Sequence, residues 1–278
     1  MTTQPIPAAR SGGPASAIGD SLVVMWRNLK RIPRIPELAI FAILQSIMFV
    51  LLFAFVFGGA IALPGYPDPN AFREYLMPGI FAQTIVFAAA TTAIGIADDL
   101  GKGIVDRFRS LPMARAAVLT GRTLADVVYN GGILVVLMLS GLVVGWTIRT
   151  GVPALFAGVG LLLLFAFAMS WLGVWLGLSV PTVEVAQQVG FTVLFPITFI
   201  SNVFVATSTL PTWLQPVAEW NPTSTLTASL RQLWGNPNPV ISTSFPSQHP
   251  ILVTLVWVVV IVALFGTLGV SRYRSMSR

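Results

Sequence analysis

Apolar residues run along this chain in long uninterrupted blocks, separated by short polar segments. A helix needs roughly 20 apolar residues to cross the hydrocarbon core of a bilayer, and six blocks are long enough. They predict an all-α membrane protein with six transmembrane helices, at residues 38–57, 76–96, 124–146, 153–176, 187–206 and 251–270. The fifth block is the weakest, because it is interrupted by Gln187, Gln188, Pro196 and Asn202.

The composition supports a membrane protein and removes several kinds of chemistry. Of the 278 residues, 55% are hydrophobic and 9% are charged, whereas ordinary globular domains carry roughly 25% charged residues. The chain has no cysteine and a single histidine, His249, so we expect no disulfide, no thiolate nucleophile and no metal site. Neither H-E-x-x-H nor G-x-S-x-G occurs, and we therefore expect no enzymatic activity in this chain.

Lys and Arg residues gather in alternate connecting segments, and this asymmetry predicts the orientation of the spans. With the N-terminus inside, 13 of the 16 Lys and Arg residues fall on the inner side; the outer three are Arg73, Arg149 and Arg231. We therefore expect a transmembrane domain at residues 37–270 with both termini in the cytoplasm, the C-terminal tail being residues 271–278. The net charge of +6 then reflects topology and not nucleic-acid binding. The first block exceeds the roughly 7–15 apolar residues of a cleaved signal peptide, so we expect it to be retained.

The region before the first span divides into two parts. Residues 1–17 are rich in Pro, Ala, Ser and Gly and are expected to form a disordered cytoplasmic tail. In residues 18–34 the apolar positions Ile18, Leu22, Met25, Trp26 and Leu29 recur at helical spacing, which predicts an amphipathic interfacial helix. The residues expected at the membrane surface are Trp26, Arg27, Lys30, Arg31 and Arg34. The helix is either a plain topology anchor or shapes the approach of a substrate.

The inner connecting segment 97–122 is far more charged than the rest of the chain. Within it, Ile104, Phe108 and Leu111 recur at i, i+4 and i+7, which predicts a short helix with one apolar side, ended by Pro112. A short helix of this kind suits docking into a groove of another protein. The alternative is a solvated loop whose charges only fix the topology.

The outer segment 207–235 is long and rich in tryptophan, and Asn221-Pro222 divides it. We interpret it as two short re-entrant or interfacial helices that meet at this break, with their indoles at the level of the lipid headgroups. His249 lies in the turn-rich stretch that follows and is expected at the surface.

No span carries an ionisable side chain deep in its middle, because Glu37, Asp126 and Glu184 fall near inner ends. A proton-coupled pump usually needs an intramembrane carboxylate, so its absence argues against an antiporter. Arg122, Asp126 and Asn130 follow one another at i+4 steps. They predict either a local ion pair that seats the third span or a link between that span and the inner loop. Since the chain has no evident energy source, a partner must supply one.

Residues 75–126 resemble permease subunits of type 2 ATP-binding-cassette (ABC) exporters, above all the actinobacterial daunorubicin-resistance subgroup. The sequence there is YLMPGIFAQTIVFAAATTAIGIADDLGKGIVDRFRSLPMARAAVLTGRTLAD. Residues 44–61 (LQSIMFVLLFAFVFGGAI) and 195–224 (FPITFISNVFVATSTLPTWLQPVAEWNPTS) fit the same family. The resemblance implies a bacterial plasma-membrane permease that exports hydrophobic or amphipathic drugs. It also implies a separate ATPase subunit that binds ATP and magnesium, and a second permease, identical or similar, while this chain binds no cofactor.

The same resemblance implies roles for individual residues. Segment 97–122 then carries the coupling helix that enters a cleft on the ATPase, and the outer segment carries re-entrant helices with a break at Asn221 and Pro222. The residues placed at the ATPase surface are Asp99, Lys102, Gly103, Asp106, Arg107, Phe108, Arg109, Leu111 and Arg115.

Polar and aromatic residues of the spans are candidates for the substrate pathway. They are Phe81, Gln83, Thr84, Gln187, Gln188, Phe191, Thr192, Phe195, Phe199 and Asn202. The alternative for each is structural, since Gln and Thr often hold helices together in lipid. Two rival functions remain: export of an envelope lipid or glycolipid by the same machinery, and a secondary transporter that needs no ATPase.

Overall fold

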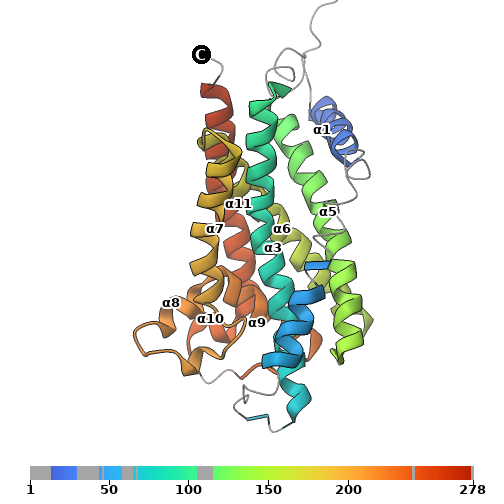
Figure 1. The fold of residues 1–278 in the computed structure, drawn as a ribbon, viewed down its shortest axis with the longest axis vertical. Coiled ribbons are helices and arrows are strands. Elements are labelled where there is room, and N and C mark those ends of the chain that lie inside the picture. Colours follow the sequence, from blue (N-terminus) through green and yellow to red (C-terminus); the bar gives the residue numbers. More distant parts are fainter. Residues whose placement is uncertain are drawn as a thin grey trace, which may run out of the picture.

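The computed structural model describes residues 14–29, 44–45, 47–57, 65–66, 68–104, 115–239 and 242–276 (Figure 1). These parts are almost entirely helical. The long helices are α3 (Pro69–Gly101), α5 (Arg115–Val144), α6 (Val152–Ser179), α7 (Val183–Phe199) and α11 (Pro250–Ser275). The shorter elements are α1 (Pro14–Leu29), the π-helical turn η2 (Leu52–Phe57), η3 (Thr207–Thr209), α8 (Gln215–Trp220), α9 (Pro222–Trp234) and α10 (Phe245–Gln248).

Four of the described helices are long and apolar enough to cross a membrane. They are Asn70–Gly101, Val118–Val144, Val152–Ser179 and Pro250–Ser275, and they contain the second, third, fourth and sixth predicted blocks almost completely. The prediction of an all-α membrane protein is therefore confirmed for these four helices. The first block lies partly outside the described residues; its described part is helical at residues 47–51 and continues into η2.

The fifth predicted span was wrong at both ends. The helix α7 runs from Val183 to Phe199 and is followed by turns at residues 200–205. Its last carbonyl groups are taken up by the side chain of Asn221, whose Nδ2 donates to the oxygen of Ile197 at 2.6 Å and of Ile200 at 2.7 Å. Because the orphan carbonyls at a helix end need such partners, this amide favours the end of α7 near Phe199. The sequence pattern missed the end because its partner lies 21 and 24 residues further along the chain.

Helix α3 stands at the centre of the bundle, between α7 and α5 in Figure 1. In its most apolar stretch 72% is buried, against 22–39% in the other three candidate spans. It packs closely on α6 because Gly173 and Gly177 have no side chains: a Cβ on Gly177 would lie 2.6 Å from the oxygen of Ala93, and one on Gly173 would collide with the oxygen of Ala89. Small residues four apart allow such close approach in lipid, where helices gain little from hydrophobic burial.

Helix α1 packs along α5 near one end of the bundle (Figure 1). Ser21 and Val24 are buried there, and a Cβ on Gly121 would collide with both of them. Leu22 and Trp26 are 48% and 59% exposed on the other side of the helix. The predicted apolar stripe thus includes residues that face away from the protein, as lipid contact requires. Of the predicted membrane-surface residues, Lys30, Arg31 and Arg34 lie outside the described residues.

Candidate functional site

The charged connecting segment begins and ends at the same end of the bundle, which we call the loop end. Helix α3 finishes at Gly101, and Gly103 adopts a positive φ of 65° that turns the chain away from the helix axis. Helix α5 begins at Arg115. Asp106, Arg107, Phe108, Arg109 and Leu111, five of the predicted coupling residues, lie outside the described residues, as does the side chain of Arg115.

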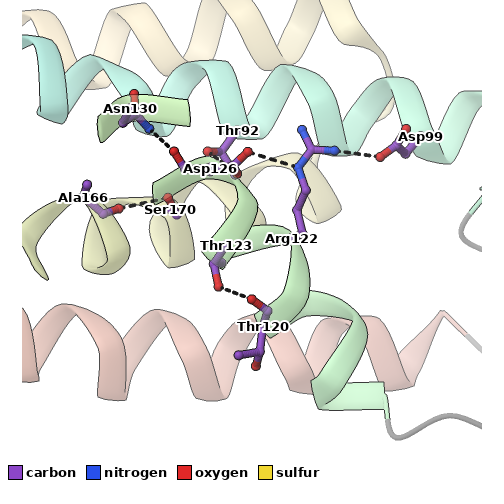
Figure 2. Close-up of polar contacts among 9 residues, drawn as sticks. All are labelled: Thr92, Asp99, Thr120, Arg122, Thr123, Asp126, Asn130, Ala166 and Ser170. Carbon is purple, nitrogen blue, oxygen red and sulfur yellow. Dashed lines mark hydrogen bonds and ion pairs between the residues drawn. The ribbon is translucent and has the colours of Figure 1, made fainter. Parts of the chain in front are cut away.

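A polar cluster joins α3 to α5 just inside this segment (Figure 2). The guanidinium of Arg122 donates from Nη1 to Oδ2 of Asp99 at 2.8 Å, and its Nε lies 3.3 Å from Oδ1 of Asp126. The hydroxyl of Thr92 donates to the other oxygen of Asp126 at 2.9 Å. We call Thr92, Asp99, Arg122 and Asp126 the loop-end cluster. Arg122 therefore forms the predicted local ion pair with Asp126 along α5, and it also pairs across to Asp99 of α3.

The loop-end cluster is largely shielded from solvent. The side chains of Arg122, Asp99 and Asp126 keep only 16%, 13% and 17% of their surface exposed. The guanidinium lies directly over Gly95, where a Cβ would collide with Nη2 of Arg122. Asn130, the third member of the predicted i+4 series, donates to the main-chain oxygen of Asp126 at 2.8 Å and not to its carboxylate. The cluster is therefore a compact ion-pair network that ties together the two helices flanking the loop.

The two remaining described coupling candidates differ from Asp99. Lys102 is exposed and pairs with Asp98 at 2.7 Å, one turn back on α3. Gly103 is exposed at the turn. Asp99 is instead largely buried and pairs with Arg122, so its described contacts are within the bundle.

Nine of the ten predicted substrate-pathway residues fall into two groups, and the tenth, Asn202, lies in the turn after α7. Phe81 and Gln83 are buried in the core, and Phe81 packs edge-on against Trp146 with ring centroids 5.1 Å apart. Thr84 donates to the oxygen of Ile80, one turn back. The α7 residues are exposed: they are Gln187, Gln188, Phe191, Thr192, Phe195 and Phe199. Gln188 donates to the hydroxyl of Thr192 at 3.4 Å.

Five phenylalanines form a continuous row of rings along α7, the turn that follows it and the described part of the first span. Neighbouring ring centroids are 4.1–5.4 Å apart in the order Phe195, Phe199, Phe204, Phe53 and Phe49. Phe195 and Phe199 are 51% and 44% exposed. Phe49, Phe53 and Phe204 were not among the predicted pathway residues, although the i+4 spacing of the first two is visible in the sequence.

A buried arginine organises the opposite end of the bundle, which we call the far end. Arg231 of α9 has no exposed surface. Its Nε donates to the oxygen of Tyr75 at 2.9 Å, and its Nη2 donates to the oxygens of Asn202 and Val203 at 3.0 and 3.2 Å. Its Cζ lies 3.4 Å from the centre of the Tyr75 ring. Arg231 was predicted only as an outer charge, because its partners come from α3 and from the turn after α7.

The chain belongs to the ABC-2 type transporter family, which matches residues 21–234. It is therefore an ABC transporter permease, in agreement with its long apolar helices. One relative is the daunorubicin resistance ABC transporter permease protein DrrB1 of Streptomyces coeruleorubidus. The two chains are 30% identical over 219 residues, which cover 79% of this chain and 76% of that relative.

Proposed function

We propose that this chain is the membrane subunit of an ATP-driven exporter that moves hydrophobic or amphipathic compounds, drugs among them, out across the bacterial cytoplasmic membrane. The similarity over 79% of the chain to a drug-resistance permease is the observation that carries the proposal. The loop end then faces the cytoplasm, because the inner segments hold 13 of the 16 Lys and Arg residues. Both termini are cytoplasmic in this arrangement.

ATP hydrolysis belongs to a separate partner chain, which holds ATP and magnesium. That partner docks on segment 97–122, with Phe108 as the apolar anchor and Arg107 and Arg109 as its charged flanks. A second permease, identical or similar to this one, completes the pathway. This chain contributes binding and movement and no hydrolytic chemistry.

The loop-end cluster supports a mechanical link between ATPase and spans. Movement of segment 97–122 pulls on both α3 and α5, and the Arg122–Asp99 ion pair and the Thr92–Asp126 hydrogen bond hold these two helices together. A force applied to the loop then moves α3 and α5 together and does not change the distance between them. Coupling in such systems requires an element with two discrete arrangements, and the α3–α5 pair is the unit that would move.

The row of phenylalanines, exposed at Phe195 and Phe199, supports a route for compounds with flat apolar rings. Such rings pack well face-to-edge or offset against aromatic side chains. Phe195 and Phe199 present their surface outside the core, so a compound in the membrane can reach them.

Affinity purification from native membranes, followed by mass spectrometry and an ATPase assay, tests the proposal. We expect the wild-type chain to retain an ABC ATPase. The variant Arg107→Glu/Phe108→Ala/Arg109→Glu should insert normally but lose it, since the loop lies outside the lipid. The control Arg274→Glu reverses a charge near the C-terminus and should retain the ATPase. A chain that transports in vesicles with no ATPase present would refute the proposal and favour a secondary transporter.

Export of an envelope lipid or glycolipid is the second candidate, favoured by the exposed Leu22 and Trp26 on α1 beside the basic residue Arg27. Such a surface suits contact with anionic lipid headgroups. Stimulation of the ATPase of the reconstituted complex distinguishes the two candidates. Stimulation by planar aromatic drugs, and not by envelope lipids, supports drug export.

A further inference from the structure

The turn after α7, at residues 200–205, lies against helix α3 at the far end of the bundle. Gly79 of α3 allows this close approach, because a Cβ there would lie 2.8 Å from the oxygen of Val203 and 3.1 Å from its Cα. The side chain of Val203 has no exposed surface. The main chain of the turn therefore rests directly on α3.

Tyr75 and Arg231 supply the hydrogen bonds across this contact. The hydroxyl of Tyr75 donates to the main-chain oxygen of Asn202 at 2.7 Å. The guanidinium of Arg231 donates from Nε to the oxygen of Tyr75 and from Nη2 to two carbonyls of the turn, so it bridges α3 and the turn. Within the described parts of the chain, every hydrogen bond that joins α3 to the turn or to α9 involves Tyr75.

Other hydrogen bonds join the end of α7 and the turn to α9. Asn221 caps the end of α7, and its Oδ1 accepts from the main-chain N–H of Thr223 at the start of α9. The oxygen of Ser224 accepts from the main-chain N–H of Asn202 at 3.0 Å. The end of α7, the turn and the first half of α9 are therefore one hydrogen-bonded unit. When α3 shifts, the hydrogen bonds of Tyr75 are the ones that must break for this unit to separate from it.

Two features make this contact easier to break. Pro78 has no main-chain N–H, so α3 has one hydrogen bond fewer beside Gly79 and bends more readily there. Nη1 of Arg231 and Oδ1 of Asn202 are buried with no hydrogen-bond partner among the described residues. A buried polar atom without a partner costs free energy, which is recovered when water reaches it. The contact is therefore less stable than one in which every polar atom is satisfied.

We propose that Tyr75 and Arg231 form a latch, which holds the turn on α3 and keeps the far end closed until an ATPase acts on the loop end. This inference rests on the proposed function. Arg231 is a positioning residue in it, because it fixes the turn and contacts no transported compound. Phe204 lies in the same turn and its ring joins those of Phe199 and Phe53. Release of the turn therefore also interrupts the row of phenylalanines.

Chemical labelling of a single cysteine measures whether the turn is held, since the chain has no other cysteine. Val203→Cys places a thiol where no surface is exposed, and N-ethylmaleimide reaches it only when the turn leaves α3. In the purified chain, Tyr75→Phe should accelerate this labelling about fivefold, because it removes one hydrogen bond of the latch. Arg231→Lys should accelerate it further, because a single ammonium group does not reproduce the fork of the guanidinium.

Two controls separate the latch from a general loosening of the bundle. Val174→Cys places the thiol at an equally buried valine of α6 and should react slowly in every variant. Thr227→Val removes a buried hydroxyl of α9 that donates to an oxygen of its own helix at 2.8 Å, and it should leave the labelling of Val203→Cys unchanged. The latch is refuted if Tyr75→Phe and Arg231→Lys both leave that labelling unchanged, or if they accelerate Val174→Cys equally.

The complex reconstituted with its ATPase tests whether the latch opens. Val203→Cys should react severalfold faster in ATP than in ADP, whereas Val174→Cys should react at the same slow rate in both. A purely structural Arg231 predicts one slow rate for Val203→Cys in both nucleotides, and that result in a complex that hydrolyses ATP would overturn the proposal. Failure to recover any ATPase would instead refute the proposed function, and the labelling of the purified chain would then decide by itself whether Tyr75 and Arg231 hold the turn.

Discussion

Removal of the guanidinium from the loop-end cluster tests whether that cluster holds α3 and α5 together. In Arg122→Met the alkyl stem remains, but Asp99 and Asp126 lose the cation that lies 2.8 and 3.3 Å from them. Two carboxylates then share a poorly solvated site with no positive partner. We expect a loss of stability larger than that of any surface ion pair in the molecule.

The burial of Arg122, Asp99 and Asp126 sets the size of the stability loss expected for Arg122→Met. Removing one partner of a buried ion pair typically costs about 3–5 kcal/mol. Because the three side chains keep 13–17% of their surface exposed, we take the lower end and expect a loss of about 3 kcal/mol. Lys102→Met is the matched control, since Lys102 is 56% exposed and pairs with Asp98 at i,i+4. That change should cost no more than about 0.5 kcal/mol.

The measurement is unfolding in mixed micelles, monitored by the fluorescence of the tryptophans. Arg122→Met should be partly rescued by Asp99→Asn, because neutralising one carboxylate removes part of the uncompensated charge. In a double-mutant cycle the two changes should therefore couple by about 1–3 kcal/mol. If Arg122→Met behaves like Lys102→Met, or if the cycle shows no coupling, the cluster does not hold the two helices together.

Two further predictions concern packing and transport. Gly173→Leu should lower the free energy of unfolding by about 1–3 kcal/mol, because even a Cβ at this position collides with the main chain of α3. The control Gly160→Leu, on the same helix, has open space around it. It should change the free energy of unfolding by less than about 0.5 kcal/mol. In the reconstituted complex, Phe199→Ala should reduce stimulation of the ATPase by aromatic compounds severalfold and leave the basal rate unchanged. Phe156→Ala, which truncates a phenylalanine of α6 that is 68% exposed, should alter neither; equal losses in both variants would contradict a specific aromatic route.

The long helices could be predicted from sequence because each depends on a local property, an apolar run of sufficient length. The end of α7 could not, because Asn221 caps it from a distant part of the chain. The apolar pattern around residues 200–206 continues past the helix, so hydrophobicity alone extended the fifth span too far. The predicted end of this helix was wrong because hydrogen bonds from Asn221, a distant residue, set the observed end.

The polar contacts at the two ends of the bundle also divide into those that the sequence could predict and those that it could not. The Arg122–Asp126 pair could be predicted because i+4 spacing brings two side chains together on any helix. Asp99 could be recognised as charged, but its pairing with Arg122 depends on how α3 packs on α5. Gly95 and Gly173 gave no sequence signal, since their role is to leave space for a neighbour. The burial of Arg231 could not be predicted for a related reason, because its hydrogen-bond partners come from distant parts of the chain.

The loop-end cluster and the contacts of Arg231 both include residues of helix α3. At the far end Arg231 donates to Tyr75, near the beginning of α3, and at the loop end Arg122 donates to Asp99, near its end. These two α3 residues are 24 positions apart, which is about 36 Å at roughly 1.5 Å per residue. Because α3 is the most buried of the candidate spans, neither end can shift without disturbing the packing of the other helices on it. If the chain is the exporter subunit proposed above, a movement imposed at the loop should reach the far end as a displacement of α3, and the contacts of Arg231 with Tyr75 and the turn after α7 should then rearrange.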